Sequence, residues 1–276
     1  MPAPTRLGKS MELQKIKTKM IKYLGEDKAS YIQGLRFYYL IKIKKKKKDQ
    51  EVLLAQKLLK EGDVAIDIGA NGADWTSMIS RFVGKSGKVF AFEADPYYAK
   101  STKHTIKLLG LQNISFFSIG LSNKNERLPL QILDDQGNRL TGKSNLSKTN
   151  KKTDLPFVTL KPLDEIAKEY SLINKVKFIK CDVEGFELFV FQGAKNLLKT
   201  ARPTVVLEFG SFDQYGYSKK DLYNFFVTKD YSFFIMDDMK KLKKIEESYI
   251  NDKHENVNRI FVPNEKIGLI KNFSLL

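Results

Sequence analysis

The first sixty residues place apolar side chains at helical spacing. Over residues 11–24 the apolar positions recur every three or four residues, and Gly25 ends the pattern, which predicts a helix. The same spacing predicts two further helices over about 29–44 and 49–60. From residue 63 onward the chain changes to short, almost continuous apolar runs, which is the pattern of buried strands.

Seven such strands are predicted, and helical patterns separate most of them. The strands cover residues 64–68, 88–92, 114–118, 176–181, 203–209, 231–235 and 259–262. Helices are predicted over about 73–83, 97–109, 162–170 and 219–229, and from about residue 186. Alternating strands and helices form right-handed crossovers, so we expect an α/β fold with a mostly parallel seven-stranded sheet and helices on both faces. Ligands of such sheets bind beyond the carboxyl ends of the strands.

Residues 123–160 interrupt this alternation with a polar, turn-rich segment. Within it, residues 134–138 (Asp-Asp-Gln-Gly-Asn) lie between two strand-like runs, which predicts a hairpin insertion. Long polar segments in compact domains are often functional, so the insertion is a candidate substrate lid. We expect residues 1–50 to form a basic helical extension and residues 51–276 to form one domain that contains the insertion.

The first strand ends in a glycine turn, Asp67-Ile-Gly-Ala-Asn-Gly-Ala. Gly69 permits a sharp turn, and Gly72 lets the backbone approach a ligand at the start of the next helix. The turn departs from the Gly-x-Gly-x-x-Gly pattern of dinucleotide sites, since Ala70 stands at the second glycine. Asp67 would also repel a pyrophosphate, whereas it suits a ligand with a cationic amino-acid end, such as S-adenosylmethionine. An unliganded tight turn is the alternative.

Glu93 strengthens the case for a nucleoside ligand. It follows Asp67 along the chain and ends the second predicted strand, where a carboxylate can accept hydrogen bonds from both hydroxyls of a ribose. Asp95 precedes Pro96 and is expected to cap the following helix.

A group of acids follows the fourth and fifth strands: Asp182, Glu184, Glu187 and Glu208. One of them could act as a general base toward an acceptor hydroxyl, a role that typically contributes ~10²–10⁴-fold to a rate. Grouped carboxylates also coordinate Mg²⁺ or Ca²⁺. As an alternative, Glu184 or Glu187 supplies only negative charge to the first turn of the next helix.

Five segments of the chain occur in order and at suitable spacing for a known family. They are residues 58–71, 89–96 (Val-Phe-Ala-Phe-Glu-Ala-Asp-Pro), 120–123 (Gly-Leu-Ser-Asn), 178–187 and 205–208 (Val-Val-Leu-Glu). In these segments the sequence resembles class I S-adenosylmethionine-dependent methyltransferases, and more narrowly the FkbM family. The family's usual Gly-Ala-Asn-x-Gly turn differs here, because Ala73 stands at the last glycine position.

The resemblance implies a Rossmann-like fold, S-adenosylmethionine as cofactor, and O-methylation of a saccharide or a related small-molecule or glycan acceptor. It implies that Asp67, Gly69 and Asn71 hold the methionine end, Glu93 the ribose, and residues 120–122 the adenine. The full set of expected cofactor contacts is Asp67, Gly69, Ala70, Asn71, Gly72, Thr76, Glu93, Ala94, Gly120, Leu121, Ser122 and Asp182. The expected catalytic residues are Asp182, Glu184 and Glu208. No metal ligands are assigned, and Mg²⁺ or Ca²⁺ binding is an alternative use of these acids.

The basic charge is concentrated at the N-terminus. Of the net charge of +16, residues 1–50 contribute +10, from 14 Lys/Arg and 4 Asp/Glu, and they include the run Lys44–Lys48. This segment favours contact with an anionic membrane or glycan, so we expect it to affect localisation or acceptor docking rather than chemistry. A solvated basic helix end is the alternative. A nucleic-acid partner is less favoured, because the basic segment is separate from the predicted site.

The rest of the composition excludes several classes of protein. One cysteine, Cys181, and two histidines exclude a disulfide framework and a Cys/His metal centre. No apolar run approaches the ~18 residues of a membrane span, and the N-terminus lacks the pattern of a secretion signal. We therefore expect a cytoplasmic protein, peripheral to a membrane surface if its N-terminus binds one. An RNA methyltransferase and a non-catalytic membrane- or glycan-binding protein are the competing functions.

Overall fold

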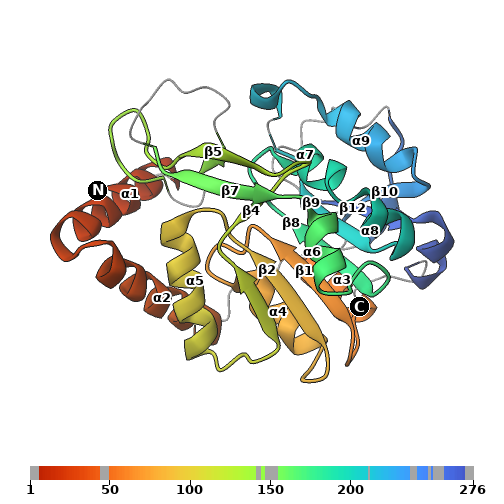
Figure 1. The fold of residues 1–276 in the computed structure, drawn as a ribbon, viewed down its shortest axis with the longest axis horizontal. Coiled ribbons are helices and arrows are strands. Elements are labelled where there is room, and N and C mark those ends of the chain that lie inside the picture. The colour runs from red at the N-terminus through yellow and green to blue at the C-terminus, as the bar shows by residue number, and fades with distance from the viewer. Residues whose placement is uncertain are drawn as a thin grey trace.

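The computed structural model describes residues 6–43, 50–140, 144–146, 155–210, 212–236, 241–247, 250 and 258–270. The run Lys44–Lys48 and parts of the insertion lie outside these residues. Figure 1 shows a central sheet with helices on both sides and a smaller sheet beside it. None of the helices in the described part of the chain combines the length and apolarity of a membrane span.

Eight strands form the main sheet, in the order β11-β10-β12-β9-β8-β1-β2-β3. Their bounds are β1 (Val64–Ile68), β2 (Lys88–Phe92), β3 (Ile114–Phe117), β8 (Val176–Cys181), β9 (Thr204–Glu208), β10 (Tyr231–Met236), β11 (Leu242–Lys244) and β12 (Asn258–Pro263). The strands β3, β2, β1, β8 and β9 pair in parallel. β12 runs antiparallel between β9 and β10. The predicted α/β fold with a mostly parallel sheet is confirmed.

The sheet has eight strands instead of the seven that the sequence predicts. The additional strand, β11, pairs with the outer edge of β10, where Leu242 lies opposite Met236. Its sequence, Leu-Lys-Lys, exposes both lysines to solvent, as is common at a sheet edge. A strand of this kind has no apolar run, so the hydrophobic pattern missed it.

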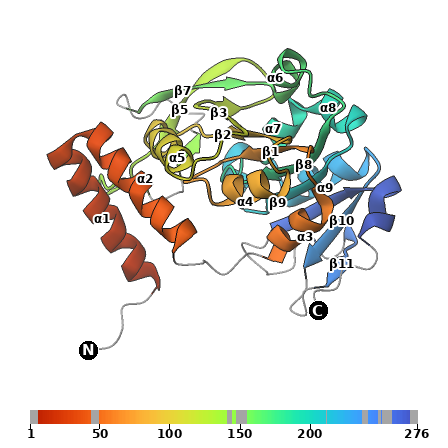
Figure 2. The same ribbon diagram turned by 90° about the horizontal axis from the view of Figure 1, so that it is seen from below.

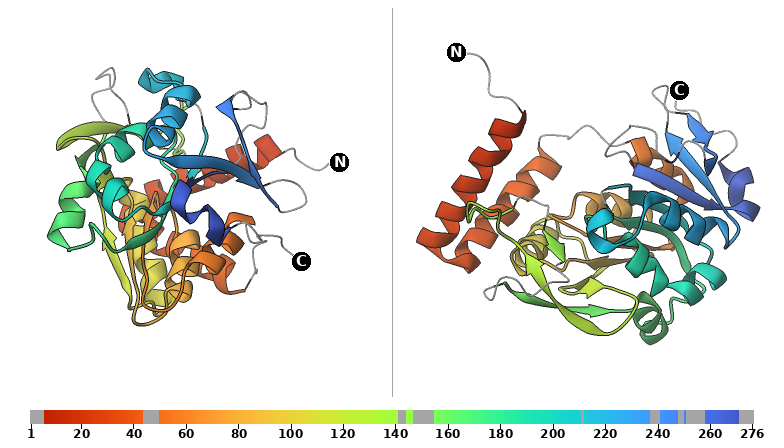
Figure 3. Two further views of the ribbon diagram at one scale, coloured as in Figure 1. Left: turned by 90° about the vertical axis from the view of Figure 1, so that its right-hand side faces the viewer. Right: turned by 90° about the horizontal axis from the view of Figure 1, so that it is seen from above.

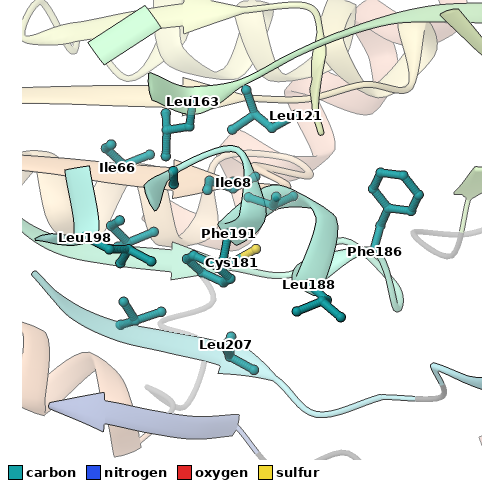
Figure 4. Packing of buried hydrophobic residues seen from close by; sticks show 14 of the residues in the cluster. Ile66, Ile68, Leu121, Leu163, Cys181, Phe186, Leu188, Phe191, Leu198 and Leu207 are labelled. Atoms are coloured by element: carbon teal, nitrogen blue, oxygen red, sulfur yellow. The ribbon is translucent and has the colours of Figure 1, made fainter. Parts of the chain in front are cut away.

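Side chains alternate between the two faces of the sheet, and each face has its own core. Ile66 and Ile68 of β1 pack in a cluster with residues of four helices, part of which Figure 4 shows: α6 (Leu163–Glu169), α7 (Glu187–Gln192), α8 (Lys195–Thr200) and α9 (Lys219–Val227). Ala65 packs on the opposite face with α3 (Gln50–Leu58) and α4 (Asp74–Phe82). Cys181, at the end of β8, is fully buried in the first cluster. The chain also forms two short 3₁₀ helices, η1 (Asp213–Tyr215) and η3 (Asn264–Leu269).

The N-terminal extension forms two helices, α1 (Arg6–Leu24) and α2 (Glu26–Lys42), and α2 packs along α5 (Pro96–Leu108), as Figure 2 shows. α2 and α5 approach each other closely at Gly34, where a β-carbon would lie 2.7 Å from Cβ of His104. Thr105 Oγ1 donates a hydrogen bond to the carbonyl of Gly34 (3.3 Å). Lys100 forms an ion pair with Asp27 (2.7 Å). The division at residue 50 stays a prediction, but the extension is docked on the α/β domain.

The insertion forms most of a second sheet, with the strand order β4-β7-β5-β6. Its strands are β4 (Gly120–Leu121), β5 (Glu126–Gln131), β6 (Asn145–Leu146) and β7 (Phe157–Lys161). β5 pairs antiparallel with β7, and the N–H of Asp134 donates to the carbonyl of Asn138 (2.8 Å) in the predicted turn. Across that turn β5 pairs antiparallel with β6. The interpretation of residues 123–160 as a hairpin insertion and lid stays a prediction.

Candidate functional site

Backbone contacts hold the turn after β1 between the two neighbouring strands. The N–H of Gly69 donates to the carbonyl of Phe92 at the end of β2 (2.9 Å). The N–H of Asp182, directly after β8, donates to the carbonyl of Ile68 at the end of β1 (2.9 Å). Gly69 has a φ of 81°, and a β-carbon there would lie 1.9 Å from the carbonyl oxygen of Asp182. The close approach of the two strand ends therefore requires glycine at this position.

Asp67 lies behind this turn, on the α4 side of the sheet. It is 1% exposed, and its carboxylate accepts a hydrogen bond from Thr76 Oγ1. Burial raises the pKa of Asp67 to about 6, although Thr76 and Lys180, its register partner on β8, act in the opposite direction. Asp67 and Thr76, both predicted as direct cofactor contacts, thus bind each other in this structure.

Glu93 joins the end of β2 to the glycine turn. Its Oε2 accepts a hydrogen bond from the N–H of Asn71 (3.0 Å), and its Oε1 accepts one from the N–H of Asp95 (2.9 Å). Burial, with a contribution from the Asp95 carboxylate, raises the pKa of Glu93 to about 7. Because each carboxylate oxygen can accept a second hydrogen bond, Glu93 keeps acceptor capacity toward the cavity that it lines.

Asp95 caps α5 as the sequence predicts. Its Oδ1 accepts hydrogen bonds from the N–H groups of Tyr97 (2.9 Å) and Tyr98 (3.4 Å), and Pro96 occupies the first turn. Its side chain is 3% exposed and also forms an ion pair with the guanidinium of Arg139. Asp95 therefore connects the second strand end to the insertion.

A cavity opens at the carboxyl edge of the sheet, beside these residues. Eight of the predicted site residues line it: Gly69, Asn71, Glu93, Ala94, Gly120, Leu121, Asp182 and Glu184. Six others are not part of its wall: Asp67, Ala70, Gly72, Thr76, Ser122 and Glu208. The rule that ligands bind beyond the strand ends thus located the cavity, but it did not separate residues in the wall from residues behind it.

Ser122 illustrates this difference. Gly120 and Leu121 face the cavity, whereas Ser122 Oγ donates to the carboxylate of Glu126 on β5 (2.7 Å). The N–H of Ser122 donates to the carbonyl of Lys161 on β7 (3.0 Å). Ser122 therefore ties the small sheet together, and its contact with an adenine stays a prediction.

The structure brings three of the predicted acids together. One carboxylate oxygen each of Asp182, Glu184 and Glu208 lies within 4.8 Å of the others. Lys180, at the end of β8, is 2% exposed and places Nζ 3.4 Å from Oδ2 of Asp182. A buried ammonium group therefore lies beside Asp182, one member of the acidic cluster.

This arrangement separates the pKa values of Asp182 and Glu208. Burial, followed by the hydrogen bond with Asp182, raises the pKa of Glu208 to about 8. Burial also raises the pKa of Asp182, but the charge of Lys180 and the hydrogen bond with Glu208 outweigh it, so the pKa falls below its usual value. The shared hydrogen bond and the charge of Lys180 thus favour the ionised form of Asp182 and the protonated form of Glu208.

Glu184 and Glu187 follow the same strand but have different surroundings. Glu184 lines the cavity and has a φ of 53°, an uncommon left-handed conformation for a residue other than glycine. Glu187 is 1% exposed, and its Oε1 accepts a hydrogen bond from the N–H of Val183 (3.1 Å). Burial raises the pKa of Glu187 to about 7. Glu184 thus belongs to the cavity wall, whereas Glu187 supports the loop.

The insertion adds wall residues that the sequence analysis did not single out. Ser144 and Leu146 line the cavity, and Ser144 Oγ donates to Oδ2 of Asp95 (2.7 Å). The guanidinium of Arg139 is centred 4.7 Å from the ring of Tyr97. These residues come from a segment without an apolar pattern, so only the proposal of a lid over 123–160 pointed to them.

Comparisons of the sequence with known proteins identify a family and a relative. The family model of the methyltransferase FkbM domain matches residues 67–235. Protein-L-isoaspartate O-methyltransferase of Methanococcus aeolicus is 36% identical over 56 residues, which are 20% of this chain and 26% of that protein.

Solved structures of methyltransferases also align with this chain, at low sequence identity. The crystal structure of methyltransferase FkbM from Methylobacillus flagellatus KT aligns with a TM-score of 0.50 and 12% identity, over 92% of this chain and 59% of that chain. A putative rRNA methylase from Clostridium thermocellum aligns with a TM-score of 0.46 and 14% identity, over 78% of this chain and 93% of that one. The matched part of the chain thus covers less than two thirds of the isoaspartate methyltransferase (26%) and of the Methylobacillus protein (59%).

Proposed function

Because this chain belongs to the FkbM methyltransferase family, we propose that it transfers a methyl group from S-adenosylmethionine to a hydroxyl of a saccharide or of a related small-molecule or glycan acceptor. The observation that carries the proposal is the acidic cluster beside the glycine turn that follows β1: Asp182, Glu184 and Glu208. A hydroxyl must lose a proton when its oxygen is alkylated, and Asp182 and Glu184 supply carboxylates at the cavity wall, with Glu208 beside Asp182.

The residues of the cavity fit S-adenosylmethionine. Glu93 keeps acceptor capacity for the two ribose hydroxyls. The apolar side chains of Ile119, Leu121 and Leu130 line part of the wall, as an adenine ring requires. Asp182 and Glu184 supply negative charge toward the cationic methionine end. In this assignment Asp67 does not line the cavity; it binds Thr76 behind the glycine turn.

When bound, S-adenosylmethionine supplies a methyl group on a sulfonium, which is already reactive toward an oxygen nucleophile. The protein then has two tasks, which are to position the acceptor and to receive its proton. Lys180 keeps Asp182 ionised, so its carboxylate can accept the hydrogen bond of the acceptor hydroxyl. Glu184, held by its left-handed backbone at the same wall, is the second acceptor of that proton.

Lys180 also bears on whether the acids bind a metal. Its buried ammonium group lies 3.4 Å from Asp182. Burial lowers the pKa of Lys180, but the negative charges of Asp182, Asp67 and Glu208 outweigh burial and raise this pKa above its usual value. It provides at this point the positive charge that Mg²⁺ or Ca²⁺ would otherwise provide. We therefore assign proton transfer and positioning, rather than metal coordination, to the cluster.

An acceptor screen tests the proposal. Purified protein is incubated with methyl-labelled S-adenosylmethionine and, separately, with nucleotide sugars, glycans and RNA. We expect label on a saccharide hydroxyl. Transfer to RNA would establish the competing RNA methyltransferase, and failure to bind S-adenosylmethionine in calorimetry would contradict the enzyme altogether.

A further inference from the structure

Helix α2 carries exposed apolar side chains in addition to the buried face that packs on α5. Its buried residues are Ala29, Ser30, Gln33 and Gly34. Tyr31, Leu35, Tyr39 and Ile43 follow one another at intervals of four residues and are 45%, 40%, 52% and 62% exposed. Residues at this spacing lie along one side of a helix. We call these four residues the outer stripe.

The outer stripe belongs to a wider concentration of exposed apolar side chains. Of the fourteen large apolar side chains that are exposed in the described part of the chain, nine lie between residues 13 and 43. Figure 3 shows the two N-terminal helices at one end of the molecule, with the late strands at the other. Soluble proteins seldom gather apolar side chains on one surface unless that surface binds a partner.

The charge around the stripe indicates which partner. Residues 6–43 hold nine Lys/Arg against three Asp/Glu, and Lys28, Arg36 and Lys42 are exposed on α2 itself. A second copy of this chain would bring the same positive charge to the contact, which disfavours a dimer through this face. Nucleic acid matches the charge but offers no apolar medium for Leu35 and Ile43.

We propose that the outer stripe of α2 docks on an anionic membrane surface. The aliphatic side chains enter the apolar boundary of the headgroup region, the tyrosine hydroxyls stay at the polar level, and the flanking cations meet acidic lipid headgroups. The helix lies on the surface and does not cross it. Tyr31 contacts the ring of His104 on α5 (centroids 5.2 Å apart) and so lies at the margin of the stripe, while the buried residues of α2 lie on its other side. Docking through Leu35, Tyr39 and Ile43 therefore leaves the inner face of α2 and the cavity in place. The proposal is independent of the methyl transfer assigned above.

Vesicle sedimentation of the full chain tests this docking. The probes are vesicles of phosphatidylcholine with and without phosphatidylserine. The wild type should bind only the vesicles that contain phosphatidylserine, and added salt should weaken binding. The double variant Leu35→Gln/Tyr39→Gln leaves the charge unchanged and should bind these vesicles at least about tenfold more weakly than the wild type.

A matched control removes exposed apolar side chains elsewhere. Phe157 and Leu269 are 49% and 63% exposed, and Phe157→Gln/Leu269→Gln should bind vesicles as the wild type does. Thermal unfolding monitors folding in both double variants. Equal loss of binding in both, or equal binding of the wild type to neutral and anionic vesicles, overturns the proposal. A lipid-free dimer, or an RNA complex, that Leu35→Gln/Tyr39→Gln abolishes would assign the stripe to that partner instead.

Discussion

The ring of Phe37 lies against Gly72, where a β-carbon would come within 2.7 Å of three ring atoms. Phe37 belongs to the N-terminal extension, and Gly72, with a φ of 89°, belongs to the turn beside the cavity. The N–H of Gly72 donates to Thr102 Oγ1 of α5 (3.0 Å). Helices α2 and α5 therefore support the turn from outside, while Asn71 contacts Glu93 on its cavity side.

This contact changes what is expected of the extension. The sequence suggests that residues 1–50 affect localisation and leave cofactor binding alone, but Phe37 reaches the turn itself. We expect Phe37→Ala to weaken S-adenosylmethionine binding about tenfold, or ~1.4 kcal/mol, because the turn loses its outer support and must be ordered on binding. Calorimetry measures the affinity.

Two variants make this result interpretable. Phe37→Leu should restore most of the affinity, since it refills the space over Gly72, and Tyr39→Ala removes an exposed ring of the same helix without touching the turn. An unchanged affinity in Phe37→Ala, with the fold intact by circular dichroism, would show that the ring only fills space.

Gly69→Ala should destabilise the fold strongly. The new β-carbon would meet the carbonyl oxygen of Asp182 at 1.9 Å, so the ends of β1 and β8 must separate, at about 3 kcal/mol or more. Gly110→Ala is the matched control, because Gly110 also has a positive φ but no atom within 4 Å of the added carbon. It should cost only ~1 kcal/mol. Urea unfolding of both variants gives the comparison, and equal losses would refute the close approach at Gly69.

The strands that define the site could be predicted almost to the residue. β1, β2 and β8 have the predicted bounds, because strands buried on both faces are continuous apolar runs and local pattern is enough to find them. Glu93 was found for a related reason, since it stands directly after such a run. A residue that comes directly after a central strand can thus be identified from the sequence.

The residues behind the cavity wall could not be predicted in the same way. Lys180 interrupts an apolar strand, and only the register that pairs it with Asp67 explains how it is tolerated there. The contact of Phe37 with Gly72 and the ion pair of Arg139 with Asp95 join segments far apart in the chain. Helical or strand periodicity contains no information about such pairs, which tertiary packing creates.

Glu184→Gln and Asp182→Asn should each lower turnover by about 10²-fold or more, because each removes a carboxylate that receives or orients the proton of the acceptor. Glu169→Gln, an exposed position on α6, should leave turnover unchanged. The rates are measured with the acceptor that the screen identifies. Full activity in both variants would move the catalytic role to Glu208 or to the insertion.

The same assay separates proton transfer from metal coordination. Since Lys180 already neutralises charge in the cluster, treatment with a chelator should leave turnover unaffected. Loss of activity that Mg²⁺ or Ca²⁺ restores would instead make Asp182, Glu184 and Glu208 metal ligands.

Stability should fall as the pH rises toward 8, and Glu187 should account for a measurable part of the loss. Burial raises the pKa of Glu187 from 4.5 to about 7 in the folded state, so the folded protein still holds a proton that the unfolded chain has released between those values. Its contribution to stability is therefore complete below about pH 4.5 and is lost as the pH rises through 7.

The variant Glu187→Gln tests this contribution. Since one pKa unit corresponds to ~1.4 kcal/mol, the variant should reduce the loss of unfolding free energy between about pH 5 and pH 8 by about 2 kcal/mol. Urea unfolding at each pH measures this, with Glu169→Gln as the exposed control. A pH dependence as steep in Glu187→Gln as in the wild type would mean that Glu187 is ionised in the folded protein throughout this range.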